Sequence, residues 1–132
     1  MVAFTGTRNF SLAADPKLAC GCGCGLLPDQ DFMERVQRAR DRTNFPWPVT
    51  SGARCAAYNA KVSGTGETGP HTTSRAIDIG VQGVQAFAVV VAMLAEGFTG
   101  IGVNQKGDKR FIHGDDVPPG SSNLPRPQIW SY

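Results

Sequence analysis

Two histidines, each close in sequence to a carboxylate, are the residues of this chain best suited to bind a metal ion. His71 precedes Asp78 by seven residues, His113 precedes Asp115 by two, and the chain has no other histidine. Two imidazoles and one carboxylate are the protein ligands of an open catalytic zinc site, in which water takes the fourth position. A carboxylate beside that water can accept its proton and pass it to a leaving amine. The pattern therefore predicts metal-assisted hydrolysis.

The spacing of these residues demands particular local structure. Over seven residues of helix, His71 and Asp78 would lie about 10 Å apart, too far for one ion. Segment 62–73 is rich in Gly and contains Pro, which predicts a loop that folds His71 back onto a strand carrying Asp78. In a strand, His113 and Asp115 emerge on the same face about 7 Å apart, so one can bind metal while the other acts on the water. The alternative is that both histidines are ordinary surface or hydrogen-bonded residues.

A second group suited to metal binding consists of four cysteines, Cys20, Cys22, Cys24 and Cys55. Cysteines two residues apart are poorly placed to bridge each other, so a disulfide would join Cys55 to one of the other three. The spacing also differs from the paired C-x-x-C of common zinc sites. We therefore expect buried, reduced thiols in a tight Gly-rich turn, with a second metal site at these four residues as the alternative.

Periodicity and turn residues predict the elements that position these groups. The expected elements are a helix at 29–43, strands at 49–51 and 76–79, a short helix at 56–61, a helix at 84–96 and a hairpin of strands at 101–103 and 111–113. Their order predicts an α+β fold in which a short antiparallel sheet packs with two main helices. In the helix at 84–96, the stripe expected to face the core consists of Val84, Phe87, Ala88, Val91, Leu94 and Ala95.

Length and composition set the outer limits of the fold. With 132 residues we expect a single domain, 1–132, and the 16 Gly and 9 Pro predict that much of it is loop. Residues 1–28 are expected to form an N-terminal arm and the Cys/Gly loop. The tail at 117–132 contains four of the prolines and is expected to be irregular.

The charge balance and hydropathy exclude two classes of partner. The net charge is +2, from 13 Lys and Arg against 11 Asp and Glu, and the basic residues are scattered, which argues against nucleic-acid binding. No apolar run approaches the about 18 residues that a membrane span needs. The N-terminal residues lack the pattern of a secretory signal, so we expect synthesis in the cytoplasm. We also expect a monomer.

Several motifs occur along the chain in the order typical of one family. Residues 69–78 read GPHTTSRAID, similar to S-x-H-x-x-G-x-A-x-D, and residues 100–102 and 111–115 read GIG and FIHGD, similar to G-I-G and F-I-H-x-D. Residues 51–59 and 126–132 read SGARCAAYN and RPQIWSY, similar to S-G-x-R-C-x-x-Y-N and R-P-x-x-W-x-Y. Together they resemble the zinc D-alanyl-D-alanine peptidase family, which shares the fold of the hedgehog signalling domain, and above all its short bacterial and phage members.

The resemblance implies a role for individual residues. It makes His71, Asp78 and His113 the zinc ligands, and Arg54 the arginine that polarises the scissile carbonyl and steadies the oxyanion. Asp115 matches the H-x-D of the motif and becomes the expected base. Many members of the family instead carry the catalytic Glu or Asp three residues before the last histidine, where this chain has an arginine, so Asp116 and Asp108 stay as alternatives to Asp115. The side chains expected to contact substrate are Ser51, Thr72 and Tyr58.

The first motif departs from the family at residue 74, where Ser74 replaces the usual glycine. This replacement is costly only if the backbone there has a positive φ.

The function implied by the resemblance is hydrolysis of a peptide bond in bacterial cell-wall peptidoglycan, next to a D-alanine, with one zinc ion as cofactor. The enzyme would act on stem peptides as a carboxypeptidase or as an endopeptidase of the endolysin type. We expect it to reach the wall after release from the cytoplasm, as bacteriophage lysis enzymes do, or by an unknown export route. The alternative is a non-catalytic, metal-stabilised wall-binding or virion assembly protein.

Overall fold

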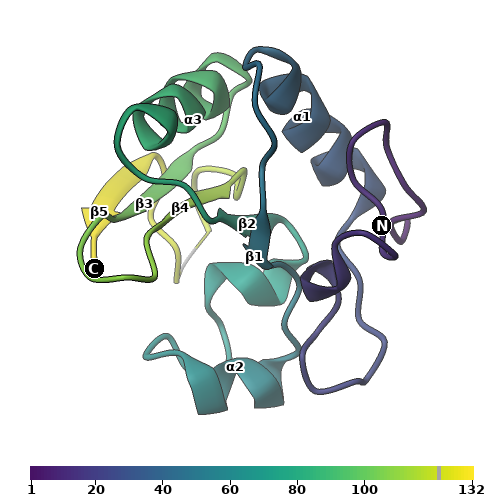
Figure 1. Cartoon of the computed structure of the whole chain (residues 1–132). Coiled ribbons are helices and arrows are strands. Elements are labelled where there is room, and N and C mark those ends of the chain that lie inside the picture. The colour runs from purple at the N-terminus through teal and green to yellow at the C-terminus, as the bar shows by residue number, and fades with distance from the viewer. Residues whose placement is uncertain (122) are drawn as a thin grey trace.

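The computed structural model of the chain describes residues 1–121 and 123–132 and has an α+β fold (Figure 1), which confirms the predicted class. The described helices are α1 (Gln30–Asp41), α2 (Ala56–Val62) and α3 (Gly83–Ala95), with two short helical turns, η1 (Pro16–Leu18) and η2 (Pro70–Thr73). The strands are β1 (Val49–Ser51), β2 (Ala76–Ile79), β3 (Gly100–Asn104), β4 (Phe111–Asp115) and β5 (Gln128–Ser131).

The five strands form one sheet in the order β1-β2-β4-β3-β5. The neighbours up to β3 are antiparallel, as predicted, but β5 pairs with β3 in parallel, so the sheet is mixed. The prediction that the whole tail is irregular was wrong at β5. The prolines of the tail all precede Gln128, and from there the alternating residues find a free edge on β3.

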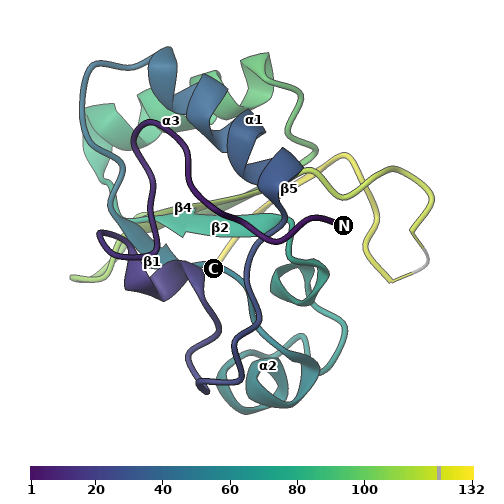
Figure 2. The ribbon, with the colours of Figure 1, turned by 90° about the vertical axis from the view of Figure 1, so that its right-hand side faces the viewer.

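The sheet separates a helical layer from the face that carries the candidate site. In Figure 2, α1 and α3 lie on one side of the sheet and α2 on the other. Ile77, Ile79 and Ile112 point to the helical side and are buried in the hydrophobic core. Because side chains alternate along a strand, the residues between them point to the opposite face. Asp78 and His113 therefore face the side on which α2 and η2 lie.

The N-terminal arm is part of the core. Phe4, Phe10 and Leu18 are buried among the core residues of the helices and the sheet. An isolated bridge between Ala3 and Asp29 fixes the start of the arm against the start of α1. The arm is therefore anchored to the core at Phe4, Phe10 and Leu18.

Helices α1 and α3 differ in how well their buried faces were predicted. In α1, periodicity predicts one apolar face, formed by Phe32, Met33, Val36 and Ala39, and all four are buried. The stripe predicted for α3 was wrong, since Phe87 is 74% exposed and Val84, Val91 and Leu94 are exposed too. The buried residues of α3 are Ala86, Val89, Ala92 and Met93. Helix α3 carries apolar side chains on all of its faces, so periodicity alone does not show which face is buried.

Within the described residues, no helix has the length and apolar character that crossing a lipid bilayer requires.

Candidate metal centre and active site

The structure brings His71, Asp78 and His113 together on the face of the sheet away from α1 and α3. His71 Nε2 lies 3.2 Å from Asp78 Oδ1, His113 Nδ1 lies 3.1 Å from the same oxygen, and the two ring nitrogens are 3.2 Å apart. All three side chains are buried. We refer to these three residues as the triad.

Each member of the triad is placed by a different part of the fold. Asp78 on β2 and His113 on β4 are direct cross-strand partners, so their side chains emerge together. His71 lies in the turn η2, and its Nδ1 hydrogen-bonds the carbonyl oxygen of Gly52 at 2.7 Å. This bond fixes the ring with Nε2 toward Asp78. The chain returns from η2 to β2 through Ser74, whose φ of 62° makes the sharp turn.

The donor atoms of the triad fit a zinc ion. The three atoms form a nearly equilateral triangle with edges of 3.1–3.2 Å. Two ligands of a tetrahedral zinc ion at bond lengths of about 2.0–2.1 Å lie about 3.3–3.4 Å apart, so the triangle matches one face of that tetrahedron. Two imidazoles and a carboxylate are also the donor types of catalytic zinc. The residues therefore fit the metal predicted from the sequence.

The protein environment keeps the Asp78 carboxyl ionised. Burial alone would raise its pKa, but the charges and hydrogen bonds of His71 and His113 outweigh burial and hold the pKa below its usual range. A carboxylate that is ionised at neutral pH is the form that ligates a metal.

Asp115, the base predicted from the sequence, lies behind the His113 ring and away from the triad atoms. Its Oδ2 lies 2.7 Å from His113 Nε2, the ring nitrogen opposite to the one in the triad. Arg126 donates to both of its oxygens, at 2.9 and 2.8 Å, and the side chain is 0% exposed. Burial would raise the pKa of the Asp115 carboxyl, but the bonds to His113 and Arg126 outweigh it and lower that pKa to about 2. The same-face prediction for His113 and Asp115 is met, yet this geometry orients the imidazole and leaves no oxygen free for water.

Two glycines of β3 make room for this arrangement. A Cβ on Gly100 would lie 2.4 Å from either oxygen of Asp115, and a Cβ on Gly102 would lie 2.8 Å from the indole of Trp130. The GIG motif of the sequence therefore has a steric reason, because both glycines face the side chains that surround His113.

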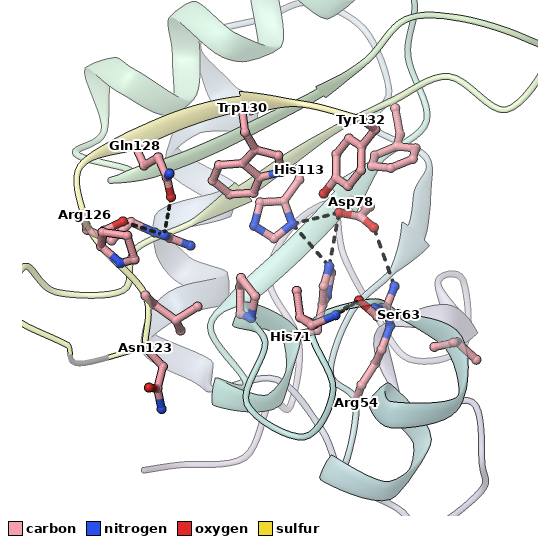
Figure 3. A pocket seen from close by; sticks show the side chains of 16 residues that line it. Arg54, Ser63, His71, Asp78, His113, Asn123, Arg126, Gln128, Trp130 and Tyr132 are labelled. Carbon is pink, nitrogen blue, oxygen red and sulfur yellow. Dashed lines mark hydrogen bonds and ion pairs between the residues drawn. The ribbon is translucent and has the colours of Figure 1, made fainter.

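A pocket of about 330 Å³ opens above the triad (Figure 3). Trp130 packs against the His113 ring with 5.1 Å between ring centroids, and Tyr132 lies beside Asp78. Burial raises the pKa of the Tyr132 phenol, so its hydroxyl keeps its proton at neutral pH. Among the lining residues that the structure describes, Asp78 is the only carboxylate.

Arg54, to which the family resemblance gives the role of stabilising the oxyanion, lies in the wall of the same pocket. Its Nη2 lies 3.9 Å from Asp78 Oδ2, and its guanidinium donates to Ser51 Oγ and to Asn59 Oδ1. Its backbone N–H donates to the carbonyl oxygen of His71 at 3.0 Å. Arg54 is thus a positioned cation next to the triad, with neutral partners that hold the guanidinium in place.

The other residues predicted from the sequence do not line this pocket. Ser51 binds Arg54 instead, Thr72 caps its own turn through the Gly69 carbonyl, and Tyr58 lines a separate hollow near the N-terminal loop. The two alternative bases lie outside the pocket lining as well. Asp116 pairs with Arg75 and Arg35, and Asp108 is exposed in the β3–β4 turn. These residues therefore lie outside the described lining of the pocket, and their substrate and base roles stay predictions.

Sequence reasoning missed the part that the tail contributes. Arg126, Trp130 and Tyr132 all line the pocket, and the Arg126 guanidinium lies 5.1 Å from the centroid of the Trp130 ring. The RPQIWSY motif is the sequence signal for this contribution. The motif supports the family resemblance, but it does not by itself assign any of its residues to the pocket.

The four cysteines are brought together, but in a setting that differs from the prediction. Their sulfurs all lie within 4.8 Å of one another, and all four are unbridged. Cys20 is buried and Cys55 half-buried, whereas Cys22 and Cys24 are exposed. The expectation of buried thiols was therefore wrong for two of the four.

Comparison with known proteins identifies a family. A family model described as Peptidase M15 matches residues 13–115, which is more than half of the chain and includes the triad, Arg54 and the four cysteines. A search of curated proteins and a search of solved structures found no match.

Proposed function

The chain belongs to the peptidase M15 family, the zinc D-alanyl-D-alanine peptidases, and from this premise we propose that it hydrolyses a peptide bond next to D-alanine in bacterial peptidoglycan. The observation that carries the proposal is the triad, whose three donor atoms match one face of a zinc tetrahedron at the base of a pocket. Membership of the family supports a zinc-dependent peptidase in general. The particular bond is our proposal.

The triad would hold the zinc ion through His71 Nε2, Asp78 Oδ1 and His113 Nδ1. When bound in such a site, zinc polarises a carbonyl and makes water a nucleophile near neutral pH. The fold supplies the remaining orientation: the Gly52 carbonyl fixes the His71 ring, and Asp115 fixes the His113 ring.

Arg54 would act on the substrate carbonyl. Negative charge develops on the oxygen of that carbonyl as water adds, and a fixed guanidinium stabilises it without having to reorganise. The bonds from Arg54 to Ser51 and Asn59 keep the guanidinium at the pocket wall. Tyr132 places a second donor beside Asp78, suited to a hydrogen bond with the peptide backbone.

The shape of the pocket supports a short peptide end as substrate. A volume of about 330 Å³ lies at the small end of ligand sites and suits a few residues, such as the end of a stem peptide. Its walls combine apolar side chains, including Trp130 and Leu124, with the polar groups near the triad. Small side chains such as that of D-alanine are compatible with this lining.

One observation favours a second function. The described lining of the pocket offers no carboxylate besides Asp78, and Asp115 is fully engaged, so the usual base of metal-assisted hydrolysis has no obvious counterpart. A protein that keeps the metal and the fold but binds stem peptides without cleaving them would show the same site. Such a protein would serve as a wall-binding or virion assembly component.

Defined muropeptides test the two functions directly. The zinc-loaded protein is incubated with pentapeptide stems and with crosslinked dimers, and the products are identified by mass spectrometry. Release of terminal D-alanine indicates a carboxypeptidase, and cleavage of the dimer indicates an endopeptidase. Bound zinc with binding to purified peptidoglycan but no cleavage of either substrate would establish the second function.

Two variants connect the activity to the site. His113→Ala is expected to lose both zinc at the triad and cleavage. Arg54→Lys should keep the zinc but lower kcat by about 10²–10³-fold, because an ammonium does not reproduce the guanidinium geometry. Equal loss of zinc in both variants would contradict the separate roles given to them.

A further inference from the structure

The four cysteines form a compact cluster outside the pocket, which we call the cysteine cluster: Cys20, Cys22, Cys24 and Cys55. Three come from the loop after η1 and the fourth is the N-cap residue of α2. Figure 2 shows this loop running down beside α2, on the side of the sheet away from α1 and α3. None of these thiols contributes to the proposed hydrolysis, so the cluster needs another explanation.

The spacing of the sulfurs fits one metal ion. Cys20 Sγ lies 3.4 Å from Cys22 Sγ, Cys22 Sγ lies 3.7 Å from Cys55 Sγ, and all four sulfurs lie within 4.8 Å of one another. Four thiolates at about 2.3 Å from a tetrahedral zinc ion are about 3.8 Å apart. The observed cluster therefore requires only small movements of the side chains to enclose an ion.

The backbone around the cluster is arranged for such a site. Gly23 and Gly25 have φ values of 84° and 89°. These left-handed conformations turn the loop, in which cysteine occupies every second position, so that the sulfurs converge. The backbone N–H of Cys55 donates to Cys20 Sγ at 3.3 Å, and that of Tyr58 donates to Cys55 Sγ at 3.4 Å. Amide donors to sulfur are the outer contacts that stabilise metal-bound thiolates. The alternation of cysteine and glycine in the sequence thus has a geometric reason.

We propose that the cysteine cluster binds one structural zinc ion, separate from the ion of the triad. Four soft sulfur ligands favour zinc among the common divalent ions, and a set of four protein ligands closed around the ion would leave no position for water or substrate. The compact group of sulfurs has room for one ion and is too tight for an iron–sulfur cluster, in which the thiolates bind different irons.

The ion would fasten the N-terminal loop to the segment that supports the pocket. Cys55 directly follows Arg54, and the backbone N–H of Ala53 donates to the Leu18 carbonyl at 2.9 Å. The same segment holds His71 through the Gly52 carbonyl and the Arg54 N–H. Zinc at the cysteine cluster would therefore stiffen the chain that positions both Arg54 and His71.

Cobalt substitution separates the two metal sites in the full chain. The protein is purified with a reductant, stripped of metal by a chelator and loaded with Co²⁺, and its absorption spectrum is recorded. Thiolate ligands give an intense sulfur-to-cobalt charge-transfer band in the near ultraviolet, which two imidazoles and a carboxylate do not produce. We expect this band in the cobalt-loaded protein. We also expect two zinc ions per chain when the zinc content of the zinc-loaded protein is measured by inductively coupled plasma mass spectrometry.

Matched variants assign each ion. His113→Ala should keep the charge-transfer band and bind one zinc ion, whereas the double variant Cys22→Ser, Cys24→Ser should lose the band and also bind one. Both cysteines are exposed, so serine disturbs little of the packing. If the double variant does not fold, the spectrum of the wild-type chain still decides the question. None of these measurements depends on peptidase activity, so they test the zinc site at the cysteine cluster independently of the proposed function.

Two results would overturn the proposal. One is a wild-type chain that binds a single zinc ion, with no charge-transfer band after loading with cobalt. The other is a disulfide that persists in the presence of the reductant and zinc, detected as a mass lower by about 2 Da for each bridge, because a bridged pair cannot bind the ion as thiolates.

Discussion

The triad and the cysteine cluster offer two ways to prepare a metal site. The triad stands on two paired strands and a helical turn, it is buried, and backbone or side-chain partners fix both of its imidazole rings. The cysteine cluster stands on a Gly-rich loop and one helix N-cap, and two of its thiols are exposed. Regular strands and fixed hydrogen bonds therefore position the triad, whereas the cysteine cluster depends on a loop that the proposed ion would hold together.

This difference corresponds to two uses of a metal. A site for chemistry requires ligands held in advance and one position left open, and a buried triad beside a pocket provides both. A structural site requires only enough ligands to enclose the ion, and binding itself supplies stability to the fold. The comparison therefore predicts that damage to the triad removes function, whereas damage to the cysteine cluster removes stability.

The largest effect is expected from Asp78→Asn, which keeps the shape of the ligand and removes its charge. Changing a residue that only contacts a metal ligand lowers metal affinity by about 10–100-fold. Loss of the ligating carboxylate itself should therefore lower zinc affinity at the triad by more than about 100-fold and abolish cleavage. Competition with a chelating dye measures the affinity, and muropeptide turnover measures the activity. The cobalt–thiolate band should not change, and its loss would show that the two sites are not separate.

Asp115→Asn tests whether the triad depends on the contacts behind it. The amide keeps only one acceptor oxygen for His113 and Arg126 to share, and Arg126 is left as a buried charge without its ionic partner. We therefore expect zinc affinity to fall by about 10–100-fold and the free energy of unfolding by about 3–5 kcal/mol. Urea unfolding and dye competition give the two values.

Asp116→Asn is the matched control for Asp115→Asn. Asp116 pairs with Arg75 and Arg35 away from the pocket, so its loss should reduce stability without changing zinc affinity. If Asp115→Asn keeps its zinc affinity but loses cleavage, Asp115 acts on the reaction itself and the positioning role assigned to it is incorrect.

Cys55→Ser tests the other side of the comparison. Serine is a good N-cap and can accept the Tyr58 N–H as Cys55 does, so α2 should be retained while one thiolate is removed. In the wild type, zinc at 100 times its dissociation constant at the cluster should raise the free energy of unfolding by about 2.7 kcal/mol. In a His113→Ala background, which leaves only the cluster, Cys55→Ser should abolish most of this gain. An unchanged gain would place the zinc elsewhere.

The smallest expected effect is that of Ser74→Gly, at the turn between His71 and Asp78. A non-glycine residue at a φ of 62° costs about 1–2 kcal/mol, part of which is offset because glycine loses more entropy on folding. We expect a net stabilisation of about 0.5–1 kcal/mol in urea unfolding, with zinc affinity unchanged. A destabilised variant would mean that the buried serine side chain contributes more than its backbone strain costs.

Local signals in the sequence were sufficient for most elements and for the triad. The alternation of Ile77 and Ile79 with Asp78 predicts both the strand and the face that carries the ligand, and it is observed. The rarity of histidine made His71 and His113 easy to identify. The class of the fold followed from the order of these elements.

Tertiary contacts decided what the sequence left open. Spacing placed Asp115 on the same face as His113 but carries no information on which ring nitrogen it meets, and Arg126 comes from the segment just before β5, 11 residues later. The strand β5 depends on the free edge of β3, which periodicity within the tail does not reveal. The buried face of α3 was likewise chosen by what packs against it, not by its own pattern.

The segment from Gly52 to Cys55 contacts both sites, and this connects their thermodynamics. It contacts His71 through Gly52 and Arg54, and Cys20 through the Cys55 amide. If an ion at the cysteine cluster makes this segment more rigid, part of the ordering cost of the triad is already met when its own ion arrives. Linkage then requires reciprocity. If zinc at the cysteine cluster raises the zinc affinity of the triad by some factor, zinc at the triad raises the affinity of the cluster by the same factor. The two metals would load cooperatively, so that the zinc available to the cell sets the fraction of chains that are both rigid and able to cleave.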